Sequence, residues 1–371
     1  MPIEVKKVET KKELAEFIDL PWKIYKQYPH WVPPLKNEVE RLVTPGKNPF
    51  WNHAERELYI AISDRNVAGR IAAIRDDNHD RVHNEKAGFF GFFETTEKYD
   101  VARALFDAAA VWCRARGCAF MRGPASPSSN DEYGFLLEGF DKDPALMMPY
   151  NPEYYLEYSE KYGFIKAKDL FAFLKGSATS IPARIEKIME RAKKSSPFVL
   201  RSIDPKNFKR DVEIIKTVYN LAWENNWGFV PMTDEEMDLS AASLRPFYDP
   251  DLIIIAELDG KPAGVGLTVP NANEVLKKLN GKMNLWGMVK FLWYKRNIRG
   301  CRALVGGCLP EYRKTGLIAE IFHETMVRAN GRYAWCELGW NLEDNDLINK
   351  FDAEIGGVLY KKYRLYQMAL S

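Results

Sequence analysis

Residues 303–330 read ALVGGCLPEYRKTGLIAEIFHETMVRAN, and this stretch decides which fold to expect. The apolar run from Ala303 to Leu309 predicts a strand, and Pro310 ends it. A basic turn follows, and the apolar spacing after it predicts an amphipathic helix from Gly316 to Ala329. Free backbone amides and the positive end of the helix dipole then point at one place, so the turn predicts an anion site. Its spacing is neither that of a nucleotide P-loop nor GxGxxG.

The form Arg-x-x-Gly after an apolar strand resembles the turn with which GNAT acyltransferases hold the pyrophosphate of acyl-CoA. Arg313 and Gly316 match the usual Gln/Arg-x-x-Gly-x-Gly/Ala, whereas Ile318 stands where Gly or Ala is usual. The alternative is an ordinary strand-turn-helix connection with an exposed arginine. The resemblance implies acetyl-CoA or a longer acyl-CoA as co-substrate, with no covalently bound cofactor. The binding residues that it implies are Gly306, Gly307, Leu309, Arg313, Lys314, Thr315, Gly316, Asn345 and Asn349.

An internal repeat extends the resemblance to nearly the whole chain. Residues 60–71, IAISDRNVAGRI, and 255–266, IAELDGKPAGVG, share Ile-Ala, Asp and Ala-Gly at the same spacing, and each predicts a β-hairpin. A long amphipathic helix, a short apolar strand, a second helix, a glycine and a final aromatic strand follow downstream of each hairpin. This order is the GNAT core order, and it occurs twice.

The sequence is therefore similar to bacterial proteins with two GNAT-like domains in tandem. A few such relatives are implicated in N-acylating long-chain amino alcohols, the bacterial route to ceramides. The expected fold class is α/β (α+β), and each copy has a central mixed, mostly antiparallel sheet flanked by helices. We expect an N-terminal domain at 1–175 and an acyl-CoA-binding domain at 176–371, joined by a linker at 175–180. In the first copy Glu97 and Asp100 flank the start of the long helix, where they would repel a pyrophosphate.

Composition excludes several classes of function. A chain of 371 residues suits two cores, and a net charge of +2 argues against general nucleic-acid binding. No signal-peptide pattern and no membrane-spanning apolar run is evident, and the five cysteines form no CxxC pair, so we expect a cytoplasmic protein with reduced thiols. His79 and His83 have i, i+4 spacing without an evident third ligand, and we expect no metal site.

Acyl transfer to an amine needs a base, a stabilised oxyanion and a proton for the leaving thiolate. The resemblance places the pantetheine between two core strands, here residues 303–309 and 333–340. Glu337 on the second strand is the candidate base, and a structural carboxylate paired with an arginine is the alternative. The family often has a Tyr four residues before the glycine of its last helix as the thiolate acid. Counted from Gly356 that position is Asp352, and Tyr360, Tyr363 and Tyr366 lie nearby in sequence. We name Tyr363 as the candidate, with packing on the sheet as the alternative for all three.

The acceptor region is expected after the first helix of the second copy. The stretch there offers aromatic and hydrogen-bonding side chains for a large apolar acceptor, and a packed helix end is the alternative. A polar loop in the first copy is a further candidate, with a solvated loop as its alternative. The predicted substrate-binding residues are Trp223, Glu224, Asn225, Asn226 and Trp227, together with Ser128 and Asn130.

Residues 284–300, NLWGMVKFLWYKRNIRG, resemble a basic amphipathic helix. Such a helix could make a peripheral contact with the inner face of an anionic membrane. The alternative is a helix that covers the core and turns its cationic side to solvent.

Taken together, the sequence predicts an acyl-CoA-dependent N-acyltransferase for an amine acceptor that is a small molecule or lipid-like. A Fem-like aminoacyl transferase and a non-catalytic acyl-CoA-binding or regulatory protein are the alternatives. The acceptor, the acyl chain length, the general acid and the oligomeric state are not specified by the sequence.

Overall fold

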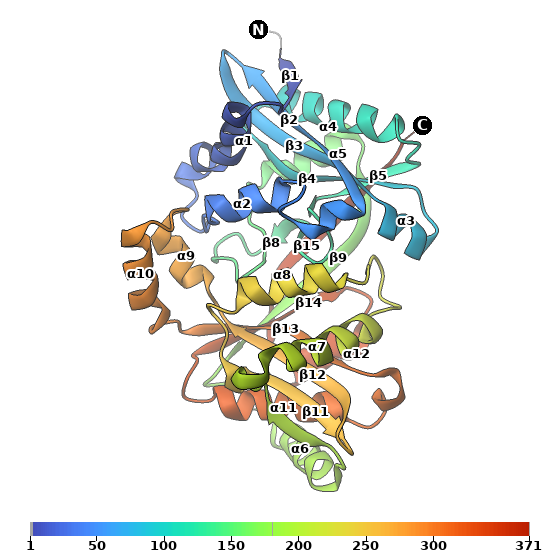
Figure 1. The fold of residues 1–371 in the computed structure, drawn as a ribbon, viewed down its shortest axis with the longest axis vertical. Helices are drawn as coiled ribbons and strands as arrows, with labels where there is room; N and C mark the ends of the chain where they lie inside the picture. The colour runs from blue at the N-terminus through green and yellow to red at the C-terminus, as the bar shows by residue number, and fades with distance from the viewer. Residues whose placement is uncertain (1–2, 180, 371) are drawn as a thin grey trace. The chain divides into compact units, whose positions relative to one another are not determined.

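The computed structural model describes residues 3–179 and 181–370 (Figure 1). The chain forms two compact units, and each is discontinuous in sequence. Unit 1 comprises Met1–Leu170, Leu276–Phe291 and Lys361–Ser371, and unit 2 comprises Phe171–Val275 and Leu292–Tyr360. The division expected from the sequence, at 175/176, stays a prediction, and Ser180 of the expected linker lies outside the described residues.

Unit 1 is built on a mostly antiparallel sheet. Its strands lie in the order β1 (Glu4–Lys7), β2 (Ala54–Ser63), β3 (Asn66–Asp76), β4 (Ala87–Thr95), β5 (Phe120–Gly123) and the second half of β15 (Val358–Ala369). Only β4 and β5 run parallel among these neighbours. Three short strands are β6 (Ala125–Ser126), β7 (Glu132–Tyr133) and β8 (Phe135–Glu138), and β8 pairs with β15. The helices are α1 (Lys11–Ile24), α2 (Lys36–Val43), α3 (Asp77–His83), α4 (Tyr99–Arg114) and α5 (Tyr154–Tyr162), with short 3-10 turns at Tyr25–Gln27 and Pro49–Asn52.

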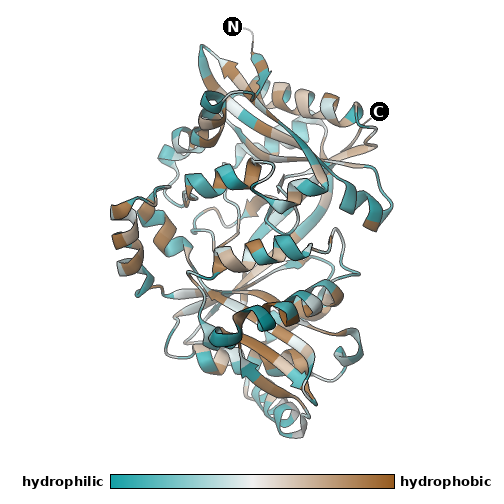
Figure 2. Ribbon diagram, in the orientation of Figure 1, coloured by the Kyte–Doolittle hydropathy of each residue, from teal (hydrophilic) through white to brown (hydrophobic). Residues whose placement is uncertain are grey.

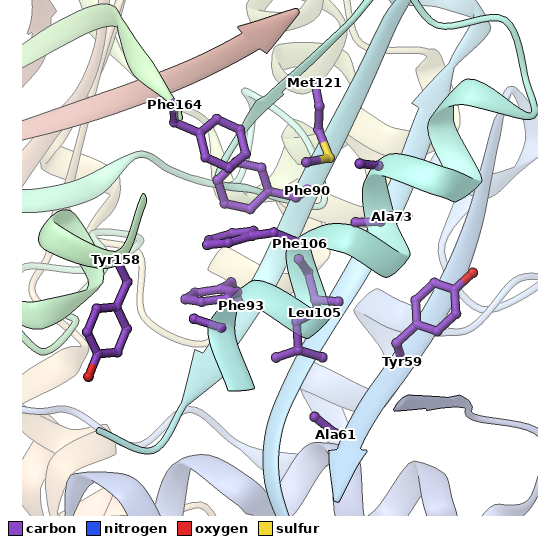
Figure 3. Close-up of a cluster of buried hydrophobic side chains, with 14 of the residues drawn as sticks. Tyr59, Ala61, Ala73, Phe90, Phe93, Leu105, Phe106, Met121, Tyr158 and Phe164 are labelled. Atoms are coloured by element: carbon purple, nitrogen blue, oxygen red, sulfur yellow. The ribbon is translucent and has the colours of Figure 1, made fainter. Parts of the chain in front are cut away.

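The core of unit 1 is aromatic. Figure 3 shows Phe90 and Phe93 of β4 beside Phe106 of α4, with the rings of Phe93 and Phe106 stacked at a centroid distance of 4.6 Å. Helix α4 buries its apolar side on this sheet face because Val101, Leu105 and Phe106 recur at helical spacing. Burial of these large side chains is the main favourable term for folding the unit.

Unit 2 repeats the arrangement. Its strands lie in the order β10 (Val199–Ser202), β11 (Ile253–Leu258), β12 (Lys261–Pro270), β13 (Gly300–Cys308), β14 (Trp335–Leu342) and the second half of β9 (Ile165–Gly176). Helix α11 (Leu317–Ala329) packs on the sheet face that carries Ile254 and Ala256, and α7 (Phe208–Ala222) packs on the opposite face, against Ile255 and Val265. The other helices are α6 (Ala183–Ser195), α8 (Asp234–Leu244) and α12 (Asp346–Glu354), with 3-10 turns at Pro205–Asn207, Pro250–Leu252 and Pro310–Tyr312.

The predicted repeat is confirmed in detail by the two hairpins β2–β3 and β11–β12. Each closes with a two-residue turn in which both residues have positive φ, Asp64-Arg65 in one and Asp259-Gly260 in the other. This geometry matches the right-handed twist of the strands. Each hairpin also shifts register directly after the alanine of the shared Ile-Ala pair, at Ala61 and at Ala256. The predicted fold class, a mixed and mostly antiparallel sheet flanked by helices, is confirmed.

The final strands of the two copies are exchanged. We expected each copy to close with its own aromatic strand, β9 in the first and β15 in the second. Instead β15 pairs with β5, from Tyr366↔Gly123 to Ala369↔Phe120, and the sheet neighbour of β14 is β9. Hydrophobic patterning identifies a strand but not its partner, so the exchange could not be read from the sequence.

Helices α9 (Asn273–Leu279) and α10 (Leu285–Lys295) form an insertion between β12 and β13. No helix of the described residues is long and apolar enough to cross a membrane.

Candidate active site

The two parallel strands of unit 2 separate partway along their length. Strand β13 pairs with β14 from Gly300↔Trp335 to Ala303↔Leu338, and there the described register ends. Beyond that point β13 remains paired with β12, through Cys308↔Gly264. An extra residue, Leu304, bulges β13 directly after Ala303. Because a bulge bends its strand and re-aims the following residues, it explains why β13 leaves β14 here.

A buried ion pair fixes the strands just before they separate. Arg302 on β13 lies opposite Glu337 on β14, and the Arg302 Nε is 3.0 Å from Glu337 Oε1. The Arg302 Nη2 also donates to the Gly339 carbonyl at 3.1 Å, and the Tyr360 hydroxyl donates to Glu337 Oε2. Glu337 is 0% exposed. Glu337, the predicted base, therefore pairs with an arginine, as expected under the alternative of a structural carboxylate. It also accepts a hydrogen bond from a tyrosine.

Aromatic side chains line the two glycines that follow on β13. A Cβ placed on Gly307 would lie 2.4 Å from the Trp223 ring, and one on Gly306 would lie 3.0 Å from the Phe322 ring. From the sequence, these two glycines are expected to bind acyl-CoA. In the structure they provide the room that Trp223 and Phe322 occupy.

The predicted acceptor segment follows α7 and contains Trp223. The Tyr219 and Trp223 rings are 5.2 Å apart, and the Asn226 amide donates to the Trp223 carbonyl at 2.8 Å. Glu224 and Asn225 are exposed, whereas Asn226 and Trp227 are half-buried.

The basic turn after β13 has the geometry predicted for it. Gly316 adopts φ +84°, which glycine tolerates without strain, and α11 begins at the next residue. In the described part of the chain no acceptor is recorded for the amides of Gly316, Ile318 and Ala319. Thr315 stabilises the turn through its hydroxyl, which donates to the Tyr312 carbonyl at 2.8 Å.

The Arg313 side chain reaches the end of α7. Its Nη2 donates to the Ala222 carbonyl at 3.2 Å and lies 3.4 Å from the Leu221 carbonyl oxygen. Cations are favourable at a helix C-terminus. The turn, the glycines of β13 and Trp223 therefore lie together, whereas Lys314 is exposed beside them. Leu309 directly follows the strand and donates its amide to the Ala263 carbonyl at 2.9 Å.

Helix α12 contributes a buried carboxyl that sequence reasoning noted only as a mismatch. Asp352 is 1% exposed, and its Oδ2 accepts a hydrogen bond from Asn341 of β14 at 2.8 Å. Its Oδ1 has no hydrogen-bond partner among the described residues. Burial raises the pKa of Asp352 to about 6, although the Asn341 bond acts in the opposite direction. Such a group exchanges its proton near neutral pH, as acid–base chemistry requires.

Two asparagines with a predicted cofactor role shape the turn before this helix. Asn345 caps α12, and its carbonyl accepts from the Asn349 amide at 3.1 Å. The Asn349 side chain donates to the Leu342 carbonyl at 2.9 Å. These contacts fix the connection from β14 into α12.

The equivalent strand pair of unit 1 also separates, but the chain itself occupies the opening. Strands β4 and β5 pair only from Ala87↔Phe120 to Phe89↔Arg122. Beyond this, the Ser126 hydroxyl accepts from the Phe92 amide at 2.9 Å. A Cβ on Gly91 would lie only 1.7 Å from the Ala125 carbonyl oxygen. Backbone from β6 thus lies against β4 at the point where β4 and β5 separate.

The other predicted site residues lie in unit 1. Ser128 bonds to Asp131 at 2.7 Å and accepts from the Asn130 amide at 3.2 Å, which makes a local turn. Tyr363 is fully buried and pairs with Leu136 of β8. The tyrosine that contacts Glu337 is Tyr360, three residues earlier. Side chains alternate between the two faces of a strand, so the sequence could have shown that Tyr360 and Tyr363 face opposite sides of the sheet. It could not have shown to which unit each tyrosine belongs.

A neighbouring carboxylate holds the first of the two histidines of α3. His79 is 3.1 Å from Glu85, and burial lowers the pKa of His79. The described residues contain no group of three or more potential metal ligands.

No known protein-family profile matches the chain. The bacterial ceramide synthase of Caulobacter vibrioides is 33% identical over 372 aligned positions, which cover 98% of this chain and 96% of that protein. Protein YghO of Escherichia coli is 31% identical over 365 positions, covering 96% and 93% of the two chains.

Solved structures agree with the tandem architecture. A tandem GNAT protein from the clavulanic acid biosynthesis pathway aligns over 100% of this chain and 99% of its own, with a TM-score of 0.58 and 11% identity. A GCN5-related N-acetyltransferase from Sphaerobacter thermophilus aligns over 99% and 96%, with a TM-score of 0.53 and 10% identity. The predicted family and fold are confirmed, and the chain belongs to the family of the bacterial ceramide synthase, the tandem GNAT-like acyltransferases.

Proposed function

We propose that this acyltransferase moves an acyl group from acyl-CoA to an amine, in unit 2. The observation that carries the proposal is the separation of β13 from β14 beside the Arg313 turn. The corresponding separation in unit 1 is filled by the backbone of Ala125 and Ser126. Unit 2 therefore offers the place for a donor, and unit 1 supports the fold.

The donor would bind through its pyrophosphate at the turn. The amides of Gly316, Ile318 and Ala319 and the N-terminus of α11 favour an anion there. On binding, Arg313 would exchange its carbonyl partners for phosphate oxygens, since charge-assisted hydrogen bonds are the stronger ones. The pantetheine would follow β13 toward Glu337.

The acceptor that we propose is a long-chain amine, lipid-like and not a small polar one. A ceramide is a long-chain amino alcohol acylated on nitrogen, and a relative with 33% identity over nearly the full length is named for making it. The aromatic rings of Trp223, Tyr219 and Phe229 form a cluster next to β13, and each buried methylene of a substrate contributes about 0.8 kcal/mol. We propose that the enzyme meets such an acceptor from the cytoplasm, at the inner membrane face.

In the reaction the amine nitrogen attacks the thioester carbonyl, the C–N bond forms and the C–S bond breaks. The amine loses a proton to a base, and the departing CoA thiolate takes one up. We propose Glu337 as the base, with Tyr360 passing to it the proton that the amine loses. Asp352, which bonds to Asn341 on the same strand as Glu337, is another group suited to hold a proton.

The test combines binding with turnover. We expect Arg313→Ala to weaken CoA binding at least about tenfold by calorimetry, because a charge-assisted contact contributes roughly 1.5–3 kcal/mol. Lys187→Ala, which removes an exposed lysine of α6, is the control and should leave the affinity unchanged. Thiol release should rise with acyl and acceptor chain length. Glu337→Gln should lower kcat about 100-fold or more while CoA affinity persists.

The outcomes separate the alternatives. CoA binding without thiol release from any amine would indicate an acyl-CoA-binding protein. Transfer from aminoacyl-tRNA but not from acyl-CoA would indicate the Fem-like activity. Unchanged CoA affinity in Arg313→Ala would refute the site, and an unchanged kcat in Glu337→Gln would leave the carboxylate a purely structural role.

A further inference from the structure

Helix α10 exposes apolar side chains to a degree that no other described element matches. Six of the fifteen exposed large apolar side chains of the described residues fall within its eleven residues. Leu285 is 89% exposed, Trp286 76% and Trp293 68%. Figure 2 shows the same helix in brown, beside elements that mix both colours. Monomeric proteins rarely expose contiguous apolar surface on this scale unless it binds something.

The exposed residues form one continuous face. At about 100° per residue, they span an arc of roughly 160° around the helix. The members of this arc are Leu285, Trp286, Met288, Val289, Leu292 and Trp293. Gly287 and Phe291 point the other way and are buried. The helix therefore packs on the protein through one side and exposes a second, apolar side to solvent. The solvent side of α10 is thus apolar as well as cationic.

Positive charge surrounds the apolar arc. Residues 275–300 contain seven lysines and arginines and no aspartate or glutamate. The whole chain is nearly balanced, with 53 basic and 51 acidic residues, so this segment is distinct. Lys290 lies on one edge of the arc and Lys295 on the other, as the helical spacing places them. Lys282, Lys290, Arg296 and Arg299 are exposed.

The insertion that carries α10 is fixed where it leaves the fold. Within unit 2, the Glu274 carboxylate accepts from the amides of Arg299 and Gly300, at 3.0 and 2.8 Å. Within unit 1, the Trp22 indole donates to the Asn280 side chain at 3.0 Å, and Lys277 pairs with Asp143 at 2.6 Å. The apolar arc is thus presented from a defined base.

We propose that α10 is an interfacial anchor that lies on an anionic bilayer. Its apolar arc would enter the boundary between headgroups and acyl chains, and the flanking lysines and arginines would meet lipid phosphates. A helix of eleven residues is about 17 Å long, too short to span a bilayer and suited to lie along its surface. After α10 the chain continues into β13, the strand that separates from β14 beside Glu337. A membrane contact at α10 would therefore lie close in sequence to the candidate active site.

Flotation of the full chain with lipid vesicles tests this proposal without any substrate. We expect retention on equal mixtures of phosphatidylcholine and phosphatidylglycerol and much weaker retention on phosphatidylcholine alone. Trp286→Ala with Trp293→Ala should lower the partition coefficient at least about tenfold, because the apolar term is lost. Lys290→Glu with Arg296→Glu should lower it on the anionic vesicles only, as should raising salt, which shortens the screening length from about 8 to about 3 Å at 1 M.

Matched controls isolate the helix. Val111→Ala with Val327→Ala removes exposed apolar groups from α4 and α11, and Lys187→Glu with Lys209→Glu reverses charges on α6 and α7. Both should change retention less than about twofold. Equal retention of the Trp286→Ala, Trp293→Ala variant and the wild type would overturn the proposal. So would a dimer that this variant dissociates while vesicles retain nothing, because the arc would then bind a second copy.

This result is separable from the proposed function. All variants should keep the thiol release measured with acyl-CoA and a long-chain amine in detergent micelles, since every changed residue is exposed and none has a role in the candidate active site. Loss of vesicle binding with retained thiol release would assign α10 to the membrane. A failure of all thiol release in the wild type would refute the acyl transfer and leave the vesicle result standing.

Discussion

Among single residues, Asp352 combines burial, an oxygen without a partner and a raised pKa. An ionised carboxylate loses its hydration on burial and regains part of that energy only through hydrogen bonds. Asn341 supplies one such bond. The native state therefore favours the protonated form of Asp352 more than the unfolded chain does.

The raised pKa of Asp352 makes the stability of the fold depend on pH. A folded pKa of about 6, above the ordinary 3.8, contributes stability that is fully present below about pH 4 and lost as pH rises through 6. At pH 8 we expect Asp352→Asn to be more stable than the wild type, by roughly 2–3 kcal/mol at most. The advantage should vanish near pH 4. Urea unfolding of both proteins across this range measures it.

The control for this prediction is Glu354→Gln, which neutralises an exposed carboxylate on the same helix. Its difference from the wild type should stay small at every pH. An Asp352→Asn difference that did not change with pH would contradict the raised pKa.

At the scale of elements, the packing of α7 on β13 depends on a glycine. A Cβ on Gly307 would lie 2.4 Å from the Trp223 ring and 2.9 Å from the Ala222 Cβ. We expect Gly307→Ala to destabilise the protein by about 1–3 kcal/mol through overpacking, as measured by thermal or urea unfolding. Gly306→Ala should cost less, because its Cβ would meet the Phe322 ring at 3.0 Å. Adding Trp223→Leu should recover much of the loss in Gly307→Ala, and an absence of recovery would contradict this contact.

The same elements show what sequence can and cannot supply. The hairpins were predictable because Asp64 and Asp259 stand at matching turns between alternating strands, and the helix after Gly316 because its apolar spacing is regular. The bulge at Leu304 was not, since it depends on how β13 registers with β12. Glu337 was located on its strand, but its partners Arg302 and Tyr360 come from elsewhere in the chain. Local pattern specifies elements, and side-chain partners arise only when the sheet forms.

At the scale of the whole molecule, the exchanged strands make each unit depend on the other half of the chain. Tyr363, Leu365 and Tyr366 of β15 are 0% exposed. Removing residues 358–371 would delete these three large buried side chains from the core. The burial of each contributes roughly 1.5–3 kcal/mol to folding, whereas the usual net stability of a protein is about 5–15 kcal/mol. We expect the truncated chain to lose the protease resistance of unit 1.

A peptide of residues 358–371 added in trans should restore part of that resistance. Fragments 1–177 and 178–371, when coexpressed, should also form a protease-resistant complex, because together they contain every strand of both units. A truncated chain that melted at the same temperature as the full chain would contradict the prediction.

The exchange also sets the order of events during synthesis. Residues 120–123 of β5 leave the ribosome long before their partners at 366–369 exist. At the usual 5–20 residues per second, the interval for the roughly 250 intervening residues is on the order of 10–50 s. The first half of this protein therefore waits, with one sheet edge incomplete, until residues 366–369 have been made. We expect chaperones to bind the unpaired strand edge of its nascent chain, because such edges are prone to aggregate.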